Sequence, residues 1–345
     1  MICRLRSSRQ GRGRYGLSNR SYTSDVYVRT PQLRTTWRFT LLSFLRKRLI
    51  TSLIAVFIVT VVIFVLARLQ GDPRTLYTDE NLSKETYDAL GAELGLDKPL
   101  VYQYFVFIRK VAVGDLGKSI HQHLPVFDIV LARLPATAKL AAAGFLFSVA
   151  VGVPLGVLSA VKRGSGWDLA GRMFAVLGHA LPSFWIAIMM IFIISVKLDL
   201  LPTSRDGGFD HFILPSIALG WAAAGGQMRL VRSAMLEVLD SQYVMLARAK
   251  GVTKESVIFK HALRNAILAP LTFAGLTLGG LITGAIITET VFAWPGLGLL
   301  AINAVTSSDY AVLQGVMIFI TFFYLFVSFA VDMIYAWADP RIRYG

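Results

Sequence analysis

Hydrophobic residues along this chain gather in long runs without Asp, Glu, Lys or Arg, and most charged residues fall between these runs. A helix that crosses the roughly 30 Å of bilayer hydrocarbon needs about 20 mostly apolar residues. Six runs have about this length. The sequence therefore predicts an all-α membrane protein with six transmembrane helices, near residues 49–68, 138–161, 173–196, 211–229, 266–289 and 310–333.

One further uncharged run, residues 290–308, is ambiguous. It contains Trp294-Pro295-Gly296-Leu297-Gly298, and a proline with two glycines does not suit a helix that faces lipid. We interpret it as a re-entrant or surface segment. A seventh span here is the less favoured alternative, because it would place Arg341 and Arg343 outside the cell.

The sign of the net charge alternates from one loop to the next. Loops rich in Lys and Arg stay on the cytoplasmic side of a membrane. We therefore expect both termini in the cytoplasm, a large external loop at residues 69–135 and a basic cytoplasmic loop at residues 230–264. An apolar run in the external loop, residues 100–113, is expected to form a helix at the membrane interface.

The composition agrees with a membrane protein, since 55% of the residues are hydrophobic and only 16% are charged, against about 25% in an average soluble domain. Much of the net charge of +14 lies near the N-terminus. We expect residues 1–40 to form a basic, disordered cytoplasmic arm and residues 41–345 to form the transmembrane domain. The arm precedes an apolar segment, so its charge fits membrane orientation better than binding to nucleic acid. The expected partners include membrane lipid and no nucleic acid.

The chain offers little catalytic or ligand-binding chemistry. Gly117-Lys118-Ser119 resembles the end of a phosphate-binding loop, but Ala112 stands where that loop needs a glycine. His121 and His123 lack a third ligand for a metal ion, and the single cysteine excludes an intramolecular disulfide. The six runs carry no charge at membrane depth, where an ion-coupled transporter usually has one. We predict no catalytic residue, no metal site and no directly bound cofactor.

Glycines recur four residues apart in the apolar runs, a spacing that lets helix backbones approach closely in lipid. We interpret these pairs as helix-packing contacts rather than as functional sites. They are Gly152 with Gly156, Gly275 with Gly279, and Gly280 with Gly284.

The basic cytoplasmic loop is predicted to contain two short helices joined by a glycine. Gly251 follows Ala247-Arg248-Ala249-Lys250 and suits the left-handed residue that ends a helix, and Thr253 is placed to cap a second helix that continues to Asn265. A DNA-binding helix–turn–helix is disfavoured because the segment is attached to the membrane at both ends. An ordinary basic loop is the other alternative, and we favour an elbow that docks a soluble partner.

This elbow resembles the permease subunits of bacterial ABC importers of the dipeptide, oligopeptide and nickel type. Those permeases carry a cytoplasmic EAA loop. Its peptide-type form reads Ala-Arg-Ala-Lys-Gly and then His-Ala-Leu-Arg-Asn-Ala, as residues 247–251 and 261–266 do here, although Met245 stands in place of the Glu of the general pattern. The resemblance extends from about residue 41 to the C-terminus and includes three further stretches, residues 94–100, 214–220 and 288–298.

The resemblance implies a channel-forming subunit of an ATP-driven importer in the bacterial cytoplasmic (inner) membrane. A periplasmic or lipid-anchored solute-binding protein would deliver a di- or oligopeptide, a second permease subunit would complete a heterodimer, and two ABC ATPase subunits would use ATP. The resemblance assigns ATPase coupling to Ala247, Arg248, Ala249, Lys250, Gly251, His261, Ala262, Leu263, Arg264 and Asn265. It assigns the translocation pathway or receptor side to Glu289, Trp294, Pro295, Gly296 and Gly298.

The alternative function is a stand-alone secondary transporter. That class predicts transport without ATP, together with an internal repeat or a buried charge in the spans. We find neither feature in the sequence.

Overall fold

A computed structural model describes residues 33–69, 84–93, 96, 98–203 and 207–338 of the chain. Two compact units are distinguished, residues 1–39 and 40–345, and apart from the first residues of α1 the features below belong to the second. Within the described ranges the only β-type pairing is an isolated bridge between Lys118 and Pro125. The prediction of an all-α protein is confirmed.

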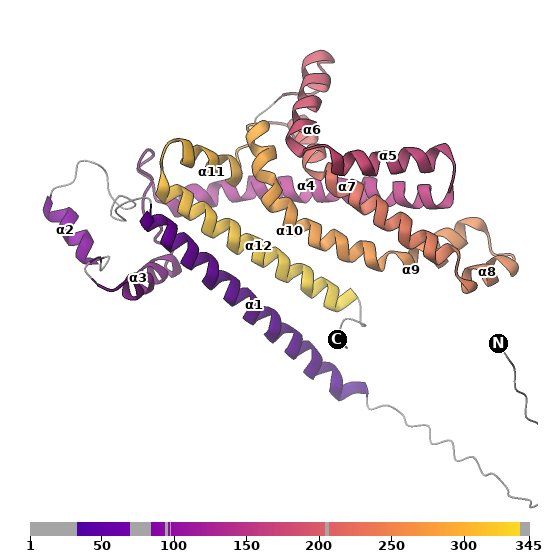
Figure 1. Cartoon of the computed structure of the whole chain (residues 1–345), viewed down its shortest axis with the longest axis horizontal. Helices are drawn as coiled ribbons and strands as arrows, with labels where there is room; N and C mark the ends of the chain where they lie inside the picture. The colour runs from indigo at the N-terminus through magenta and orange to yellow at the C-terminus, as the bar shows by residue number, and fades with distance from the viewer. Residues whose placement is uncertain (1–32, 70–83, 94–95, 97, 204–206, 339–345) are drawn as a thin grey trace, which may run out of the picture. The chain divides into compact units, whose positions relative to one another are not determined.

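Most of the helices follow one another with short connections, while longer segments separate α3 from α4 and η2 from α7 (Figure 1). Two of them, labelled η, are wound as π-helices. The elements are α1 (Leu33–Leu69), α2 (Lys84–Glu93), α3 (Leu100–Ala112), α4 (Val126–Val161), α5 (Gly166–Ala180), α6 (Ser183–Met190), η2 (Ile191–Lys197), α7 (Phe209–Leu239), α8 (Gln242–Ala249), η3 (Ser256–Leu263), α9 (Arg264–Ala266), α10 (Leu268–Val291), α11 (Leu297–Thr306) and α12 (Tyr310–Ala338).

Within the described residues, four helices are long and apolar enough to cross a membrane: Arg46–Leu66 of α1, Val126–Val161, Leu268–Val291 and Tyr310–Met333. A fifth candidate is a pair of helices, Gly166–Ala180 and Ser183–Lys197, bent by 110° relative to each other. The multi-pass character of the chain is therefore clear. The exact number of six spans is not confirmed.

The run predicted as the third span, residues 173–196, is not one straight helix. Leu181 is extended, with φ −94° and ψ 131°, and Pro182 follows it. Because the residue before a proline is pushed out of the helical region, the break falls between α5 and α6. The run predicted as the fourth span, residues 211–229, lies within α7, which is not among the helices that pass the test of length and apolarity.

Helix ends also differ from the predicted boundaries. The external loop was expected to reach residue 135, yet α4 begins at Val126, directly after Pro125. The charges that interrupt an apolar run, here Asp128, Arg133 and Lys139, do not interrupt a helix. At the other end, residues 33–40 of the predicted disordered arm lie in α1, while residues 1–32 are outside the described part.

Helix α7 packs along α4, α5 and α10, and glycines permit the closest of these contacts. A Cβ atom at Gly156 of α4 would lie 2.6 Å from Val231 Cβ and 2.8 Å from the Met228 carbonyl oxygen, and one at Gly152 would lie 2.7 Å from the Ala224 carbonyl oxygen. The packing role predicted for the first glycine pair is therefore confirmed. Gly280, by contrast, has open space around a Cβ.

Gly156→Ala should destabilise the chain because the new methyl group overlaps the backbone and a β-branched side chain of α7. We expect a loss of roughly 2 kcal/mol or more in the free energy of unfolding, as in other overpacked cores. Thermal unfolding of the purified chain in detergent measures it. Gly280→Ala is the matched control, and it should be neutral or slightly stabilising, since alanine favours a helix over glycine by about 1 kcal/mol. Equal melting temperatures for the two variants would contradict the packing account.

Two hydrophobic clusters lie toward opposite ends of α4. The first joins Val126 and Val130 of α4 to residues of α11 and α12, including Leu297 and Val316. The second joins Val157 and Ala160 to α7 and to the segment that follows it, and includes Val231, Met235, Leu239, Val244, Val257, Ala262 and Ala266. Each cluster supports one of the two segments that the sequence marks as functional.

Candidate functional site

The predicted elbow exists as two short helical segments joined at a glycine. Helix α8 ends at Ala249, and Gly251 has φ +77°, the left-handed conformation expected for it. The Gly251 N–H donates to the Arg248 carbonyl oxygen (3.0 Å), and the Val252 N–H donates to that of Ala247 (3.2 Å). A Cβ at Gly251 would meet nothing within 4 Å, so the backbone conformation alone favours glycine there.

The second half of the elbow begins where the sequence places its cap. The Val257 N–H donates to the Thr253 carbonyl oxygen at 2.9 Å. The helix is then wound as the π-helix η3 and passes through α9 into α10. Nothing in the loop sequence predicted the π winding, which matters because π-helical segments recur at functional sites.

The elbow is fixed to the transmembrane helices by a small set of inward-facing residues. Val244 and Ala247 of α8, three residues apart, are buried, as are Val257 and Ala262 of η3. Val244, Val257 and Ala262 belong to the hydrophobic cluster that holds Met235 and Leu239 of α7. Since α7 leads directly into the elbow, the two form one packed unit.

The residues assigned to ATPase coupling divide into two groups in the structure. Ala247 and Ala262 are buried, and His261 and Leu263 are half-buried. The others are exposed and available to a partner: Arg248, Ala249, Lys250, Gly251, Arg264 and Asn265.

Large apolar side chains also lie on the outside of the elbow, and the sequence reading missed them. Tyr243, Met245, Leu246 and Phe259 are exposed to 44%, 53%, 56% and 61%. A cluster of exposed apolar residues among cations is typical of a protein interface rather than of a free cytoplasmic loop. The sequence did contain a signal for them. Residues 243–246 carry no charge, and such a run does not suit a helix that is fully exposed to solvent.

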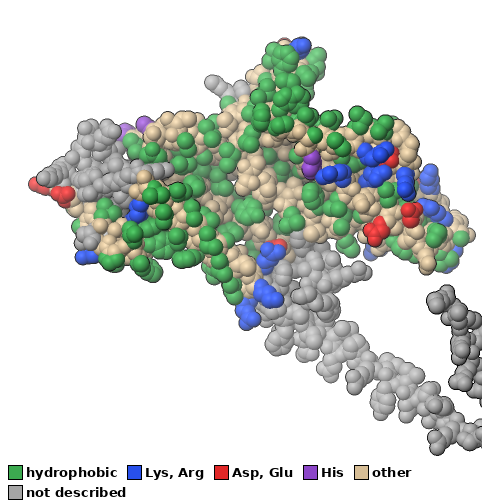
Figure 2. Space-filling model, viewed as in Figure 1, with side chains coloured by type: hydrophobic (Ala, Val, Ile, Leu, Met, Phe, Trp, Pro, Cys, Tyr) green, Lys and Arg blue, Asp and Glu red, His purple; other side chains and the backbone are tan. Residues whose placement is uncertain are grey.

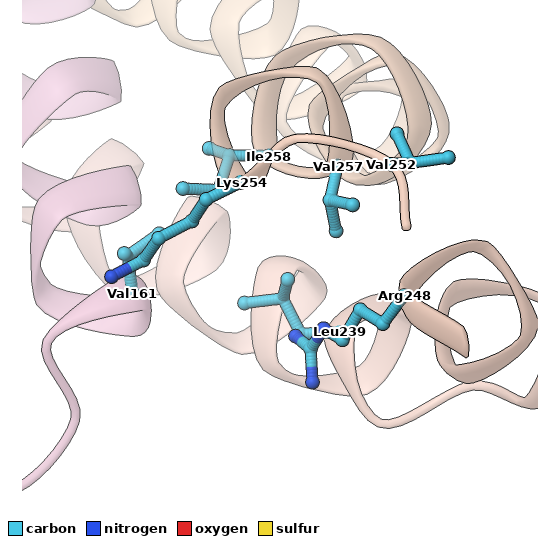
Figure 3. A pocket seen from close by; sticks show the side chains of 7 residues that line it. All are labelled: Val161, Leu239, Arg248, Val252, Lys254, Val257 and Ile258. Atoms are coloured by element: carbon cyan, nitrogen blue, oxygen red, sulfur yellow. The ribbon is translucent and has the colours of Figure 1, made fainter. Parts of the chain in front are cut away.

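A pocket of about 340 Å³ opens between the elbow and the helices that carry it. In Figure 3, Arg248 of α8 and Lys254, which precedes η3, border it from different segments. Its other lining residues are apolar: Val161, Leu239, Val252, Val257 and Ile258. Figure 2 shows Lys and Arg side chains gathered at this end of the molecule, over α5 and α8. The pocket therefore offers an apolar floor with two cations at its edge.

The second predicted site, residues 289–298, is organised by one buried carboxyl group. Glu289 near the end of α10 is 0% exposed. Its oxygens accept the Thr137 hydroxyl (2.6 Å), the Gly298 N–H (2.6 Å) and the Leu299 N–H (3.2 Å). Thr137 in turn accepts the Leu297 N–H at 2.8 Å. The N–H groups at the start of α11, which have no partner within the helix, are thus satisfied by side chains from α10 and α4.

The turn before α11 is held by the same helices. The Trp294 indole donates to the Ala136 carbonyl oxygen (3.1 Å), and Trp294 is only 4% exposed. A Cβ at Gly296 would overlap the Glu289 carboxyl group, and one at Gly298 would overlap the backbone of Ile286. These contacts explain why the segment needs its glycines.

The burial changes the interpretation of this second site. Glu289, Trp294, Gly296 and Gly298 face the interior of the chain, and Pro295 is half-buried. The two side chains, Glu289 and Trp294, are turned away from the chain's surface and position α11. Thr137 of α4, the partner of Glu289, carried no signal in the sequence, because nothing local linked it to a segment more than 150 residues away.

The predicted external loop contains the two histidines considered as metal ligands. His121 Nε2 lies 2.7 Å from the Ser307 carbonyl oxygen. Among the described residues no group of three or more His, Cys, Asp or Glu is arranged to hold a metal ion.

Comparison with known proteins gives matches over most of the chain. The family model described as binding-protein-dependent transport system inner membrane component matches residues 152–344, and the N-terminal model of the same kind of membrane component matches residues 41–141. The dipeptide transport system permease protein DppB of Escherichia coli (strain K12) is 38% identical over 306 residues, covering 79% of this chain and 90% of that protein.

Two other relatives cover more of the chain. A putative peptide transport system permease protein of Brucella abortus (strain 2308) is 37% identical, covering 86% of this chain and 98% of that protein. The glutathione transport system permease protein GsiC of Escherichia coli O6:H1 is 35% identical, covering 88% and 100%. Among solved structures, inward facing conformations of the MetNI methionine ABC transporter match with a TM-score of 0.52 and 21% identity, covering 61% of this chain and 96% of that chain. This likeness concerns the fold alone.

Proposed function

Because the chain belongs to the family of binding-protein-dependent transport system inner membrane components, it is a permease subunit of an ABC importer, and we propose that its solute is a dipeptide or an oligopeptide. The proposal for the solute rests on relatives named for dipeptide and peptide transport. The family assignment also argues against the alternative of a stand-alone secondary transporter.

The observation that carries the mechanism is the exposed surface of the elbow. Four large apolar side chains, several cations and a pocket lie on a unit that packs into α7. We propose that this surface docks an ATPase subunit, through the exposed residues assigned to coupling. Apolar anchors with cations at the rim are the usual composition of a specific interface. ATP would then be bound and hydrolysed on separate subunits, and this chain would carry no catalytic residue.

The structure suggests how a movement of the elbow reaches the membrane. Helix α7 is continuous to Leu239 and packs along α4, α5 and α10. When two ATPase subunits close on ATP, each docked elbow would be displaced, and α7 would carry its packed neighbours with it. Such a change needs a unit with two stable positions, on which both ATP and the solute-loaded receptor act.

The remaining parts of the proposal follow the same family. A second permease subunit completes the channel as a heterodimer, and a periplasmic or lipid-anchored solute-binding protein delivers the solute from outside. Both termini and the elbow lie in the cytoplasm. Residues 41–345 form the transmembrane domain, with Glu289, Trp294, Pro295, Gly296 and Gly298 fixing α11 on the receptor side.

Isolation of the tagged chain from its native membranes in mild detergent tests this function. We expect a second permease and ATPase subunits to co-purify, and the complex reconstituted in vesicles to take up a labelled dipeptide only with ATP and the solute-binding protein present. A homo-oligomer without ATPase subunits that takes up the dipeptide without ATP would overturn the importer. Uptake that depends on ATP but excludes di- and oligopeptides would overturn only the proposed solute.

A further inference from the structure

A buried acidic residue outside both candidate sites connects three helices beside the elbow. Asp168, in the first turn of α5, is 1% exposed. A carboxylate is costly to bury unless it is paired and hydrogen-bonded. The arrangement of its partners therefore indicates what this residue does.

The carboxylate of Asp168 is bound on every side. Arg232 of α7 donates from Nε to Oδ1 (2.7 Å) and from Nη2 to Oδ2 (3.1 Å), a two-pronged pairing. The Ser159 hydroxyl of α4 donates to Oδ1 (2.6 Å), and the Gly164 N–H of the α4–α5 turn donates to Oδ2 (3.0 Å). Two parallel N–H···O bonds from one guanidinium fix direction as well as distance. We call this set, Ser159, Gly164, Asp168 and Arg232, the α4–α5–α7 clamp.

The clamp lies next to the packing that holds the elbow. Val231, the neighbour of Arg232, is buried in the same hydrophobic cluster as Val244 of α8 and Val257 of η3. A Cβ at Gly171, one turn after Asp168, would lie 2.5 Å from Met228 Cε, so the Met228 side chain of α7 packs into the space that this glycine leaves on α5. The α4–α5 turn is thus fixed to α7 near the point where α7 meets the elbow.

We propose that Asp168 and Arg232 are positioning residues for energy coupling, which make the α4–α5 turn move together with α7 and the elbow. The proposal rests on the function proposed above, since it requires the elbow to receive movement from an ATPase. Hydrophobic packing between α5 and α7 is non-directional and leaves the helices able to slide. The two-pronged ion pair prevents this sliding, so that α4 and α5 move together with α7 when the elbow is displaced.

The chain provides a matched control across the same elements. Arg163 of the α4–α5 turn and Asp240 at the end of α7 lie 3.8 Å apart, Nη1 to Oδ2, with side chains 67% and 74% exposed. Exposed pairs at such a distance contribute little, because solvent screens them. Neutralising this pair removes an ion pair between the same segments without removing the clamp.

The decisive measurement is the number of dipeptide molecules taken up per ATP hydrolysed by the complete reconstituted complex. For Asp168→Asn, and for Asp168→Asn with Arg232→Gln, we expect ATP hydrolysis to persist and this ratio to fall about fivefold or more, a typical allosteric coupling between sites. The double variant removes both members of the two-pronged pair, and the only cation among the described residues that then loses a contact is Arg172, whose Nε lies 3.7 Å from Asp168 Oδ1 and whose side chain is 54% exposed. Arg163→Gln with Asp240→Asn should keep the wild-type ratio. If the complex with Asp168→Asn fails to assemble, the same ratio is measured for Arg232→Lys, which keeps the positive charge but loses the two-pronged geometry. The ratio should fall in this variant as well.

A distance measurement separates a loss of coupling from general loosening. Spin labels at Trp167 and Glu255, both exposed, report the distance between the α4–α5 turn and the elbow in a Cys3→Ser background. In the otherwise wild-type complex their separation should stay the same with and without ATP, and in the double variant it should change between the two states. A wild-type uptake ratio with unchanged separation in the double variant would overturn the clamp. Absence of ATP-dependent uptake in the wild-type complex would instead overturn the proposed function.

Discussion

We expect that reversing the charge of Arg248 and Lys254 together will abolish ATP-driven uptake while the chain still inserts and folds. Both side chains are exposed at the edge of the pocket between the elbow and the helices that carry it, and neither forms an ion pair with any described residue. Folding therefore does not depend on them. A docked ATPase that presents acidic groups to this edge would meet like charges, which cost several kcal/mol. We expect ATPase affinity to fall by roughly 100-fold or more.

The measurement is ATPase binding to the detergent-purified chain, together with uptake in vesicles and the melting temperature. A graded series of variants separates lost attraction from added repulsion. Arg248→Met with Lys254→Met removes the attraction without adding repulsion, and it should lose less affinity for the ATPase than the charge reversal. Lys118→Glu, an exposed cation of the predicted external loop, should change neither binding nor folding. Normal uptake by the double reversal would exclude a docking role for this edge.

The backbone of the elbow was predictable because local chemistry determines it. Gly251 satisfies a left-handed position, and the residues on either side are good helix formers with a capping position at Thr253. The outward direction of Tyr243, Met245, Leu246 and Phe259 was not predictable in the same way. It depends on which face of α8 and η3 the end of α7 covers, and that is a contact between segments distant in sequence.

The spans show a similar division between local and distant causes. A search for uncharged runs identifies the apolar segments of the chain. Four of the predicted spans fall in helices able to cross a membrane, the runs near 49–68, 138–161, 266–289 and 310–333. The search cannot find where a helix begins, since α4 continues through Arg133 and Lys139 back to Val126. It also misses the bend after Ala180. Pro182 was visible in the sequence, but a proline alone does not determine how a helix bends, and packing against neighbouring helices does.

The run at residues 211–229 is less apolar than the other predicted spans, and the position of α7 among other helices explains this difference. Helix α7 packs against α4, α5 and α10, and it carries Arg232 of the clamp and the last residues before the elbow. A helix surrounded by protein does not need a continuous apolar surface, whereas one surrounded by lipid does. Helix α7 can therefore carry polar residues, because it packs against other helices and connects the elbow to them.

Glu289→Ala should be the most destabilising single substitution at the end of the molecule that holds α11. Three donors converge on its carboxyl group, from Thr137, Gly298 and Leu299, and the side chain has no exposed surface. Alanine leaves these donors unpaired and creates a cavity, so we expect the free energy of unfolding to fall by about 3–5 kcal/mol. Glu289→Gln keeps the volume but points an amide toward N–H groups, and we expect it to cost about 1–2 kcal/mol.

Thermal unfolding of the purified chain in detergent distinguishes these expectations, with Glu237→Ala as the matched control. Glu237 is an exposed residue of α7, and its truncation should stay within about 0.5 kcal/mol of wild type. Gly296→Ala should resemble Glu289→Ala, because the added methyl group displaces the same carboxyl group from the N–H donors of α11. If Glu289→Ala melts like the control, the carboxyl group does not hold α11, and its burial must serve contacts made only in the assembled importer.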